Sequence, residues 1–335
     1  MKRLISALLI IMTLSTILLT ACSGNPGNDS GQNNDATKIR IGYMAGPTGM
    51  GMAKLIHDNG GTSGNEKYTF TKYADTNAAK ADLAAGNIDV ICLPTNEAAA
   101  YYNQSKNIEV LAINCLNSLY LLTDKSTTVA SLSDLEGKTI YTCKNGTPRA
   151  VLEYVISATN TNATVSYTFD GKEILTPADL GSMVTAGKLP IAVMPEPIVT
   201  SSLLAIQKSG NSDIQYSIDM DLADIWDDVK STPVTMGCVV ADKEFADDHA
   251  ALISSFLTDY KASIEFIGNT QNIETAANYI VETGIMAAAP AAKKALSNLG
   301  DAISYIDGTE MKSALEAFYN AIGISLPDGE FYFND

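Results

Sequence analysis

Short apolar or alternating runs, typical of β-strands, are separated by segments of helical periodicity over the first two thirds of the chain. After residue 242 the pattern is helical throughout, with a long amphipathic segment at 249–266. Strands that alternate with helices predict sheets covered by helices on both faces, which is an α/β fold with mainly parallel sheets. The predicted strands are 39–45, 68–73, 88–93, 108–114, 139–143, 163–169, 191–194, 214–218 and 232–241.

Four of these strands run directly into a loop rich in Gly, Pro, Thr or Asn, and a helix follows each loop. The loops lie at 46–49, 94–96, 145–148 and 195–197. A helix start presents free backbone N–H groups, and glycine allows a ligand to approach the backbone closely. One such loop is typical of an ordinary α/β turn, but four of them at the carboxyl ends of strands predict a ligand cleft.

Two extended segments, 114–122 and 232–241, interrupt the alternation and predict two crossings between two lobes. We expect lobe 1 to contain residues 38–117 and 238–335, and lobe 2 to contain residues 118–237. Each lobe then contributes two of the four loops. A ligand in the cleft would contact both lobes, and the cleft would close by hinge motion about the crossings.

The N-terminus has the pattern of an export signal. Lys2 and Arg3 precede an apolar run at 4–19, and small residues precede Cys22. We expect residues 1–21 to be removed and Cys22 to carry a lipid, because this block resembles a bacterial lipobox. The alternative is a permanent transmembrane anchor, for which the run is short. Residues 22–37 are polar and predict a flexible tether to the outer face of the cell membrane.

The chain is acidic, with a formal net charge of −16 that becomes −18 when Lys2 and Arg3 are removed with the signal. This charge excludes nucleic acid as a partner, because phosphate binding needs a basic surface. Four further cysteines lie in apolar runs without metal-ligand spacing, so we expect no metal site and no cofactor. They allow two disulfides or four buried thiols, and they are Cys92, Cys115, Cys143 and Cys238.

Four stretches resemble the solute-binding lipoproteins of ABC importers, in the group that takes up nitrate, sulfonates and thiamine precursors. They are 39–51, 132–143, 189–200 with its Met-Pro-Glu-Pro turn, and 238–266, and the tail at 326–333 adds to the likeness. The resemblance implies a type II periplasmic-binding fold with two hinge strands. It also implies a monomer that captures a small solute outside the cell and delivers it to an ABC permease and its ATPase.

The candidate ligand contacts are polar groups and tyrosines in the four loops and the first crossing. Arg149 can pair with an acidic ligand group or lie in solvent, whereas Arg40 is expected to be structural or exposed. Glu196 can accept hydrogen bonds from a ligand or serve as a helix-start acid. Tyrosines, including Tyr101 and Tyr141, can stack on a flat ring. The predicted site comprises Tyr43, Gly46, Thr48, Gly49, Thr95, Asn96, Asn117, Ser118, Tyr120, Asn145, Gly146, Thr147, Arg149 and Glu196.

The expected ligand is a small aromatic or heteroaromatic solute, such as a pyrimidine-type vitamin precursor. A small sulfonate or similar anion is the alternative, and a tethered ligand sensor is an alternative to a transport protein. An enzyme of the pyrimidine-synthase kind is the least favoured class. The chain has only His57 and His249, and it shows neither a cysteine cluster nor the spacing of a catalytic triad.

Overall fold

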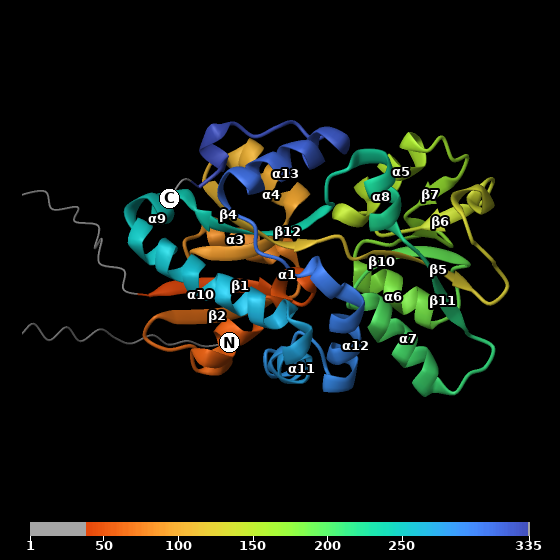
Figure 1. Ribbon diagram of the computed structural model, residues 1–335, viewed down its shortest axis with the longest axis horizontal. Coiled ribbons are helices and arrows are strands. Elements are labelled where there is room, and N and C mark those ends of the chain that lie inside the picture. The colour runs from red at the N-terminus through yellow and green to blue at the C-terminus, as the bar shows by residue number, and fades with distance from the viewer. Residues whose placement is uncertain (1–37, 334–335) are drawn as a thin grey trace, which may run out of the picture. The chain divides into compact units, whose positions relative to one another are not determined.

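The computed structural model describes residues 38–333, which form two five-stranded sheets and a small two-stranded one (Figure 1). Sheet A has the order β2-β1-β3-β12-β4, and sheet B has the order β11-β5-β10-β6-β7. The strands of sheet A are β1 (Ile39–Met44), β2 (Tyr68–Tyr73), β3 (Val90–Pro94), β4 (Ile108–Leu116) and β12 (Thr235–Asp242). Those of sheet B are β5 (Leu119–Asp124), β6 (Thr139–Tyr141), β7 (Thr164–Ser166), β10 (Ile191–Pro195) and β11 (Tyr216–Asp221). The small sheet pairs β8 (Thr168–Phe169) with β9 (Lys172–Glu173).

Helices cover both sheets, as the sequence pattern predicts. Those of the first half of the chain are α1 (Pro47–Met50), α2 (Ala53–Asp58), α3 (Thr76–Ala84), α4 (Thr95–Ser105), α5 (Thr147–Ala158) and α6 (Pro177–Thr185). The later ones are α7 (Ile198–Ser209), α8 (Leu222–Lys230), α9 (Lys243–Asp248), α10 (Ala250–Gly268), α11 (Ile273–Glu282), α12 (Ala289–Leu299) and α13 (Gly308–Ala321). The predicted two-lobed α/β fold is confirmed.

Both five-stranded sheets are mainly parallel in strand direction, as expected, and each contains one strand that runs against the other four. In sheet A, β1 is parallel to β2 and β3, but β12 is antiparallel to both β3 and β4. In sheet B, β10 is parallel to β6 but antiparallel to β5. The opposing strands are β12 in sheet A and β5 in sheet B, and each directly follows one of the two crossings.

Alternation along each strand of sheet A divides the core into two layers. Val90 and Cys92 of β3 belong to a cluster with α10, α11 and α12, whereas Ile91 and Leu93 belong to a cluster on the other face with α4 and α13. Successive strand residues point to opposite faces, so a strand buried on both sides is apolar throughout. The continuous apolar runs of the sequence are explained by this double burial.

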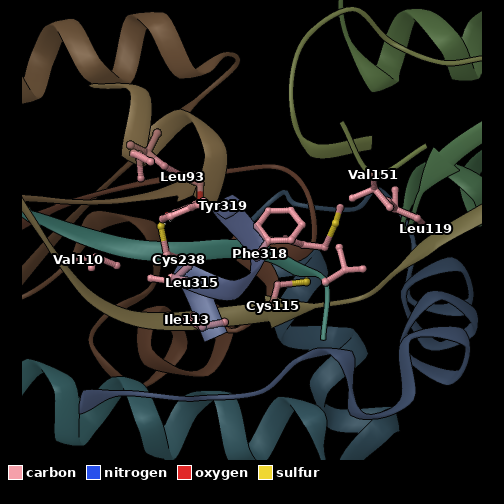
Figure 2. Close-up of a cluster of buried hydrophobic side chains, with 14 of the residues drawn as sticks. Leu93, Val110, Ile113, Cys115, Leu119, Val151, Cys238, Leu315, Phe318 and Tyr319 are labelled. Atoms are coloured by element: carbon pink, nitrogen blue, oxygen red, sulfur yellow. Dashed lines mark hydrogen bonds between the residues drawn. The ribbon is translucent and has the colours of Figure 1, made fainter. Parts of the chain in front are cut away.

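The cluster around α13 also reaches sheet B. Figure 2 shows Phe318 and Tyr319 of α13 among residues of β3, β4 and β12, with Leu119 of β5 and Val151 of α5 nearby. The ring of Phe318 lies 5.5 Å from that of Trp226 on α8. Helix α13 therefore joins the two sheets beside the crossings.

The four cysteines of the described residues are buried free thiols, which decides between the two alternatives left by the sequence. Burial raises the pKa of the Cys92 and Cys115 thiols to about 12, so they are unreactive at neutral pH. Within residues 38–333 no helix is both long and apolar enough to cross a bilayer. The predicted signal peptide, Cys22 and the tether lie outside the described residues.

Candidate functional site

A cleft of about 840 Å³ lies between residues of the two sheets. From the sheet A side it is lined by the starts of α1 and α4 and by the loop from β2 to α3. From the sheet B side it is lined by the starts of α5 and α6 and the end of β10. The carboxyl ends of strands in both sheets therefore face this space, which is where open α/β sheets bind their ligands.

Half of the predicted site residues line the cleft. They are Gly46, Thr48, Asn96, Asn145, Gly146, Thr147 and Arg149. Six of them come from three of the four predicted loops, and Arg149 directly follows the third loop in the first turn of α5. The fourth loop contributes Pro195 instead of Glu196.

Two helix starts meet across the cleft. The Thr147 hydroxyl, at the start of α5, donates a hydrogen bond of 3.1 Å to the Asn96 side-chain oxygen at the start of α4. Neither helix has a side-chain cap at its N-terminus, because Pro94 and Gly146 occupy the cap positions. The first N–H groups of both helices therefore receive no hydrogen bond from a capping side chain and can donate to other acceptors.

The first loop is held in place by packing that only glycine permits. A Cβ on Gly49 would lie 2.0 Å from the Met44 carbonyl oxygen, so no other residue fits there without a shift of the backbone. The Asn114 side-chain amide donates to the Thr48 carbonyl at 3.2 Å. Gly49 therefore shapes the loop that places Thr48 in the lining, although Gly49 itself is buried beneath it.

Much of the lining is apolar and rigid. Five prolines and Tyr101 line the cleft. Methionine, leucine and isoleucine side chains from separate parts of the chain complete its apolar surface. Proline has no N–H and a fixed φ, so such a wall offers an apolar surface that does not rearrange. These residues are Pro47, Pro94, Pro148, Pro177, Pro195, Met44, Met236, Leu175 and Ile324.

Every cation of the lining has a carboxylate partner. Lys80 lies 3.0 Å from Glu97, and the Arg149 Nε lies 2.8 Å from Glu153, both partners being lining residues themselves. Lys144 pairs with Glu173 at the rim. The Arg149 guanidinium also lies 4.7 Å from the centre of the Tyr167 ring. Pairing with Glu153 raises the pKa of Arg149, which stays charged.

Three further predicted residues are buried and bonded within the protein. The Tyr43 hydroxyl donates to the Thr283 carbonyl at 2.9 Å, and the Thr95 hydroxyl donates to the Thr235 carbonyl at 2.5 Å. The Tyr120 hydroxyl donates to the Asn298 carbonyl at 2.8 Å. None of these residues lines the cleft described here.

Asn117 and Ser118 lie at the first crossing, where the chain leaves β4 for β5. Two hydrogen bonds of Asn117 link this crossing to the second one. The Asn117 N–H donates to the Val234 carbonyl at 2.8 Å, and the Asn117 side-chain oxygen accepts from the Val234 N–H at 3.2 Å. Both residues have left-handed backbones, with φ of 49° and 74°. Asn tolerates this conformation better than most residues, which explains its presence at the tight turn.

Glu196 is fully buried at a contact between α12 and sheet B. Its carboxylate accepts from the Thr200 N–H at 3.1 Å, from the Thr200 hydroxyl at 2.8 Å and from the Asn298 side-chain amide at 2.6 Å. Burial raises the pKa of this carboxyl, and these hydrogen bonds partly oppose the rise. We call this set of Glu196, Thr200, Asn298 and Tyr120 the α12 joint.

The other singled-out residues have structural partners or border the site. Arg40 pairs with Asp89 and donates to the Gly86 carbonyl, which agrees with the structural role expected for it. Tyr101 lines the cleft, whereas the Tyr141 ring packs edge-on against Phe169 with centroids 5.6 Å apart. No cluster of three metal-ligating side chains occurs within the described residues.

Several lining residues were not predicted from the sequence. Asp75 comes from the loop between β2 and α3, and Asn77 and Lys80 come from the first turns of α3, where a strand again runs into polar residues and a helix start. The same pattern of strand, polar loop and helix could have identified this fifth loop. Met236 and Ile324 carry no such signal, because they reach the cleft only through the path of β12 and the segment after α13.

Comparison with known proteins identifies the fold. An ABC transporter protein from Parabacteroides distasonis has a TM-score of 0.69 and 21% identity, over 89% of this chain and 99% of that one. The fold is that of solute-binding proteins. The aliphatic sulphonate-binding protein of Escherichia coli has a TM-score of 0.62 and 16% identity, over 84% of this chain and 92% of its own.

The periplasmic nitrate-binding protein of Synechocystis PCC 6803 shares the same fold, with a TM-score of 0.61 and 13% identity over 86% of this chain and 81% of its own. No protein-family model and no curated protein sequence matches this chain. The structural neighbours are thus solute-binding proteins of ABC import, at identities that establish the fold alone.

Proposed function

We propose that this protein is an extracytoplasmic solute-binding protein that captures a small organic solute in the cleft and delivers it to an ABC permease and its ATPase. The observation that carries the proposal is the direct contact of two helix starts, through Asn96 and Thr147, across a cavity lined from both sheets. A solute held there contacts both sheets at once, so that its binding energy favours the closed arrangement.

The proposed ligand is an aromatic or heteroaromatic solute with polar substituents. The proline-rich walls and Tyr101 supply flat apolar surface, and Asn96, Asn145 and Thr147 supply hydrogen bonds. The volume of about 840 Å³ admits an organic molecule rather than only an inorganic ion. A small sulfonate is the second candidate, favoured by the fold shared with the sulphonate-binding protein.

We propose binding rather than catalysis. Among residues 38–333 the lining contains no histidine, cysteine or serine. Of its three carboxylates, Glu97 and Glu153 are each engaged by a cation, and Asp75 caps the start of α3. A nucleophile with an adjacent base therefore has no counterpart in this lining. The lipid anchor on Cys22, the monomeric state and the lobes at 38–117 with 238–335 and at 118–237 are proposals that follow from the sequence. The second lobe boundary falls inside β12.

The test is a thermal-shift measurement on the purified protein with pyrimidines, aromatic acids, aromatic amides and sulfonates. A ligand that binds only the native state raises the melting temperature by mass action. We expect one chemical class to raise it and no member of the panel to be consumed on prolonged incubation. Turnover of a panel member, or the absence of any shift in the whole panel, would contradict the proposed function.

A further inference from the structure

The charges of the cleft lining balance one another. Three cations, Lys80, Lys144 and Arg149, face three acids, Asp75, Glu97 and Glu153. One oxygen of the exposed Asp75 carboxylate, Oδ1, accepts from the Asn77 and Ala78 N–H groups at the start of α3. The lining therefore has no net formal charge.

We infer that the cleft selects a solute without net charge and discriminates against lone anions, through the ion pairs Lys80–Glu97 and Arg149–Glu153. This inference rests on the proposed function and names the charge class of its ligand. It separates this chain from neighbours that share its fold but are described as sulphonate-binding and nitrate-binding.

The physical reason is that each cation already has a partner at contact distance. An anion that approaches Arg149 meets the carboxylate of Glu153, 2.8 Å from the guanidinium, and the attraction and repulsion largely cancel. Glu153 holds the Nε side of the guanidinium, so an anion on the Nη groups lies beside that carboxylate, and an anion that bonds the Nε must displace it. The same argument applies to Lys80 and Glu97.

A solute without net charge has no such cost. Asn96, Asn145, Asn77 and Gln104 present amide donors and acceptors to the cleft, and the prolines present apolar surface. An amide, a pyrimidine or a zwitterion with adjacent charges can satisfy these groups without breaking either ion pair. The cleft therefore binds polar solutes without net charge more favourably than it binds anions.

The experiment measures binding of 4-toluenesulfonate by isothermal titration calorimetry to the wild-type protein and to the double variant Glu97→Gln with Glu153→Gln. The variant keeps the size of both side chains but frees Lys80 and Arg149 from their acids. We expect weak binding to the wild type and binding at least tenfold tighter to the variant, with an affinity that falls as salt is added.

The matched control is the double variant Glu274→Gln with Glu282→Gln. These acids pair with Lys293 and His57 and lie outside the cleft lining, so the control removes the same charge from the protein elsewhere. We expect the control to bind the sulfonate as the wild type does. Circular dichroism and melting temperature verify that all variants are folded.

Two outcomes would overturn the inference: sulfonate binding to the wild type as tight as to the cleft variant, or no gain in the cleft variant over the control. Neither outcome depends on which neutral solute binds. Failure of the proposed function would appear instead as the absence of any shift in the thermal panel. The two failures are therefore distinguishable.

Discussion

The cleft and the α12 joint both connect sheet A to sheet B, but they are built in opposite ways. In the cleft, Asn96 and Thr147 meet beside a cavity, and the charged side chains around them are partly open to solvent. At the α12 joint, Glu196 is fully buried and each of its partners is a protein group. The same residue types, Asn, Thr and Glu, serve both places.

The difference lies in what completes the hydrogen bonds. A buried carboxylate must find all its donors within the protein, so removing a donor or acceptor there costs stability. A polar group at a cavity can exchange its protein partner for a solute. Substitutions at the α12 joint should therefore lower the free energy of unfolding, whereas substitutions in the cleft should change the affinity for the solute.

The largest expected effect is that of Glu196→Ala. The variant leaves the buried Thr200 N–H without its acceptor and removes one of the two acceptors of the half-buried Asn298 amide, so we expect the free energy of unfolding to fall by about 3 kcal/mol. Urea denaturation followed by circular dichroism measures the change. The control Glu173→Ala removes an exposed acid of an ion pair and should change the free energy by less than about 0.5 kcal/mol. Equal effects of the two variants would remove the distinction between the joint and the surface.

The next effect concerns the crossings, which are a third connection between the sheets. Asn117→Ala loses the bond to the Val234 N–H and places an alanine at a φ of 49°, so we expect a loss of about 2 kcal/mol. Asn117→Gly loses the side-chain bond but accepts the backbone conformation, and should lose about 1 kcal/mol. Urea denaturation of the two variants separates the contribution of the side-chain hydrogen bond from the cost of the left-handed backbone. A smaller loss for alanine than for glycine would show that the left-handed backbone is not a cost.

A variant in the cleft should change the affinity for the solute more than the free energy of unfolding. Thr147→Val keeps the shape of the side chain but removes the hydroxyl that donates to Asn96. The Asn96 side-chain oxygen also faces the cavity, where it can accept from another donor. We expect the free energy of unfolding to change by less than about 1 kcal/mol. The Kd for the solute identified in the thermal panel should rise about tenfold, as calorimetry can measure. A large loss of stability with unchanged Kd would reverse the comparison.

The smallest expected effect is in the pH dependence of stability. Burial raises the pKa of Glu196 above its ordinary value of 4.5, so the folded state binds the proton more tightly than the unfolded state. The contribution of this group is therefore fully present below pH 4.5 and is lost as the pH rises through the folded pKa. Relative to Glu196→Gln, the wild type should gain stability as the pH falls from 7 toward 4.5. Parallel stability curves for the two proteins would show that Glu196 does not titrate in this way.

The sequence predicted the fold and the position of the cleft, because both depend on local patterns. Continuous apolar runs identify strands buried on two faces, and polar loops before helices identify the carboxyl edges of the sheets. The structure places Gly46, Asn96 and Thr147, which these patterns singled out, in the lining of one cavity.

Side-chain direction could not be predicted in the same way. Thr95 and Asn96 are adjacent, yet the first bonds to a carbonyl of β12 and the second faces the cleft. Glu196 follows a lining residue, but its donor Asn298 is 102 positions away in sequence. The mixed sheets depend likewise on β12, which pairs with strands more than a hundred residues earlier. Such long-range partners leave no local pattern.

The placement of β12 between β3 and β4 also determines the order in which the sheets can be completed. All strands of sheet B lie within residues 119–221, so they can pair as soon as that stretch has been synthesised. Sheet A lacks its fourth strand until residue 242 is available, and until then the facing edges of β3 and β4 have no partner. During biogenesis the later half of the chain thus completes a sheet begun by the first, and a truncation before residue 235 would leave two open edges prone to aggregation.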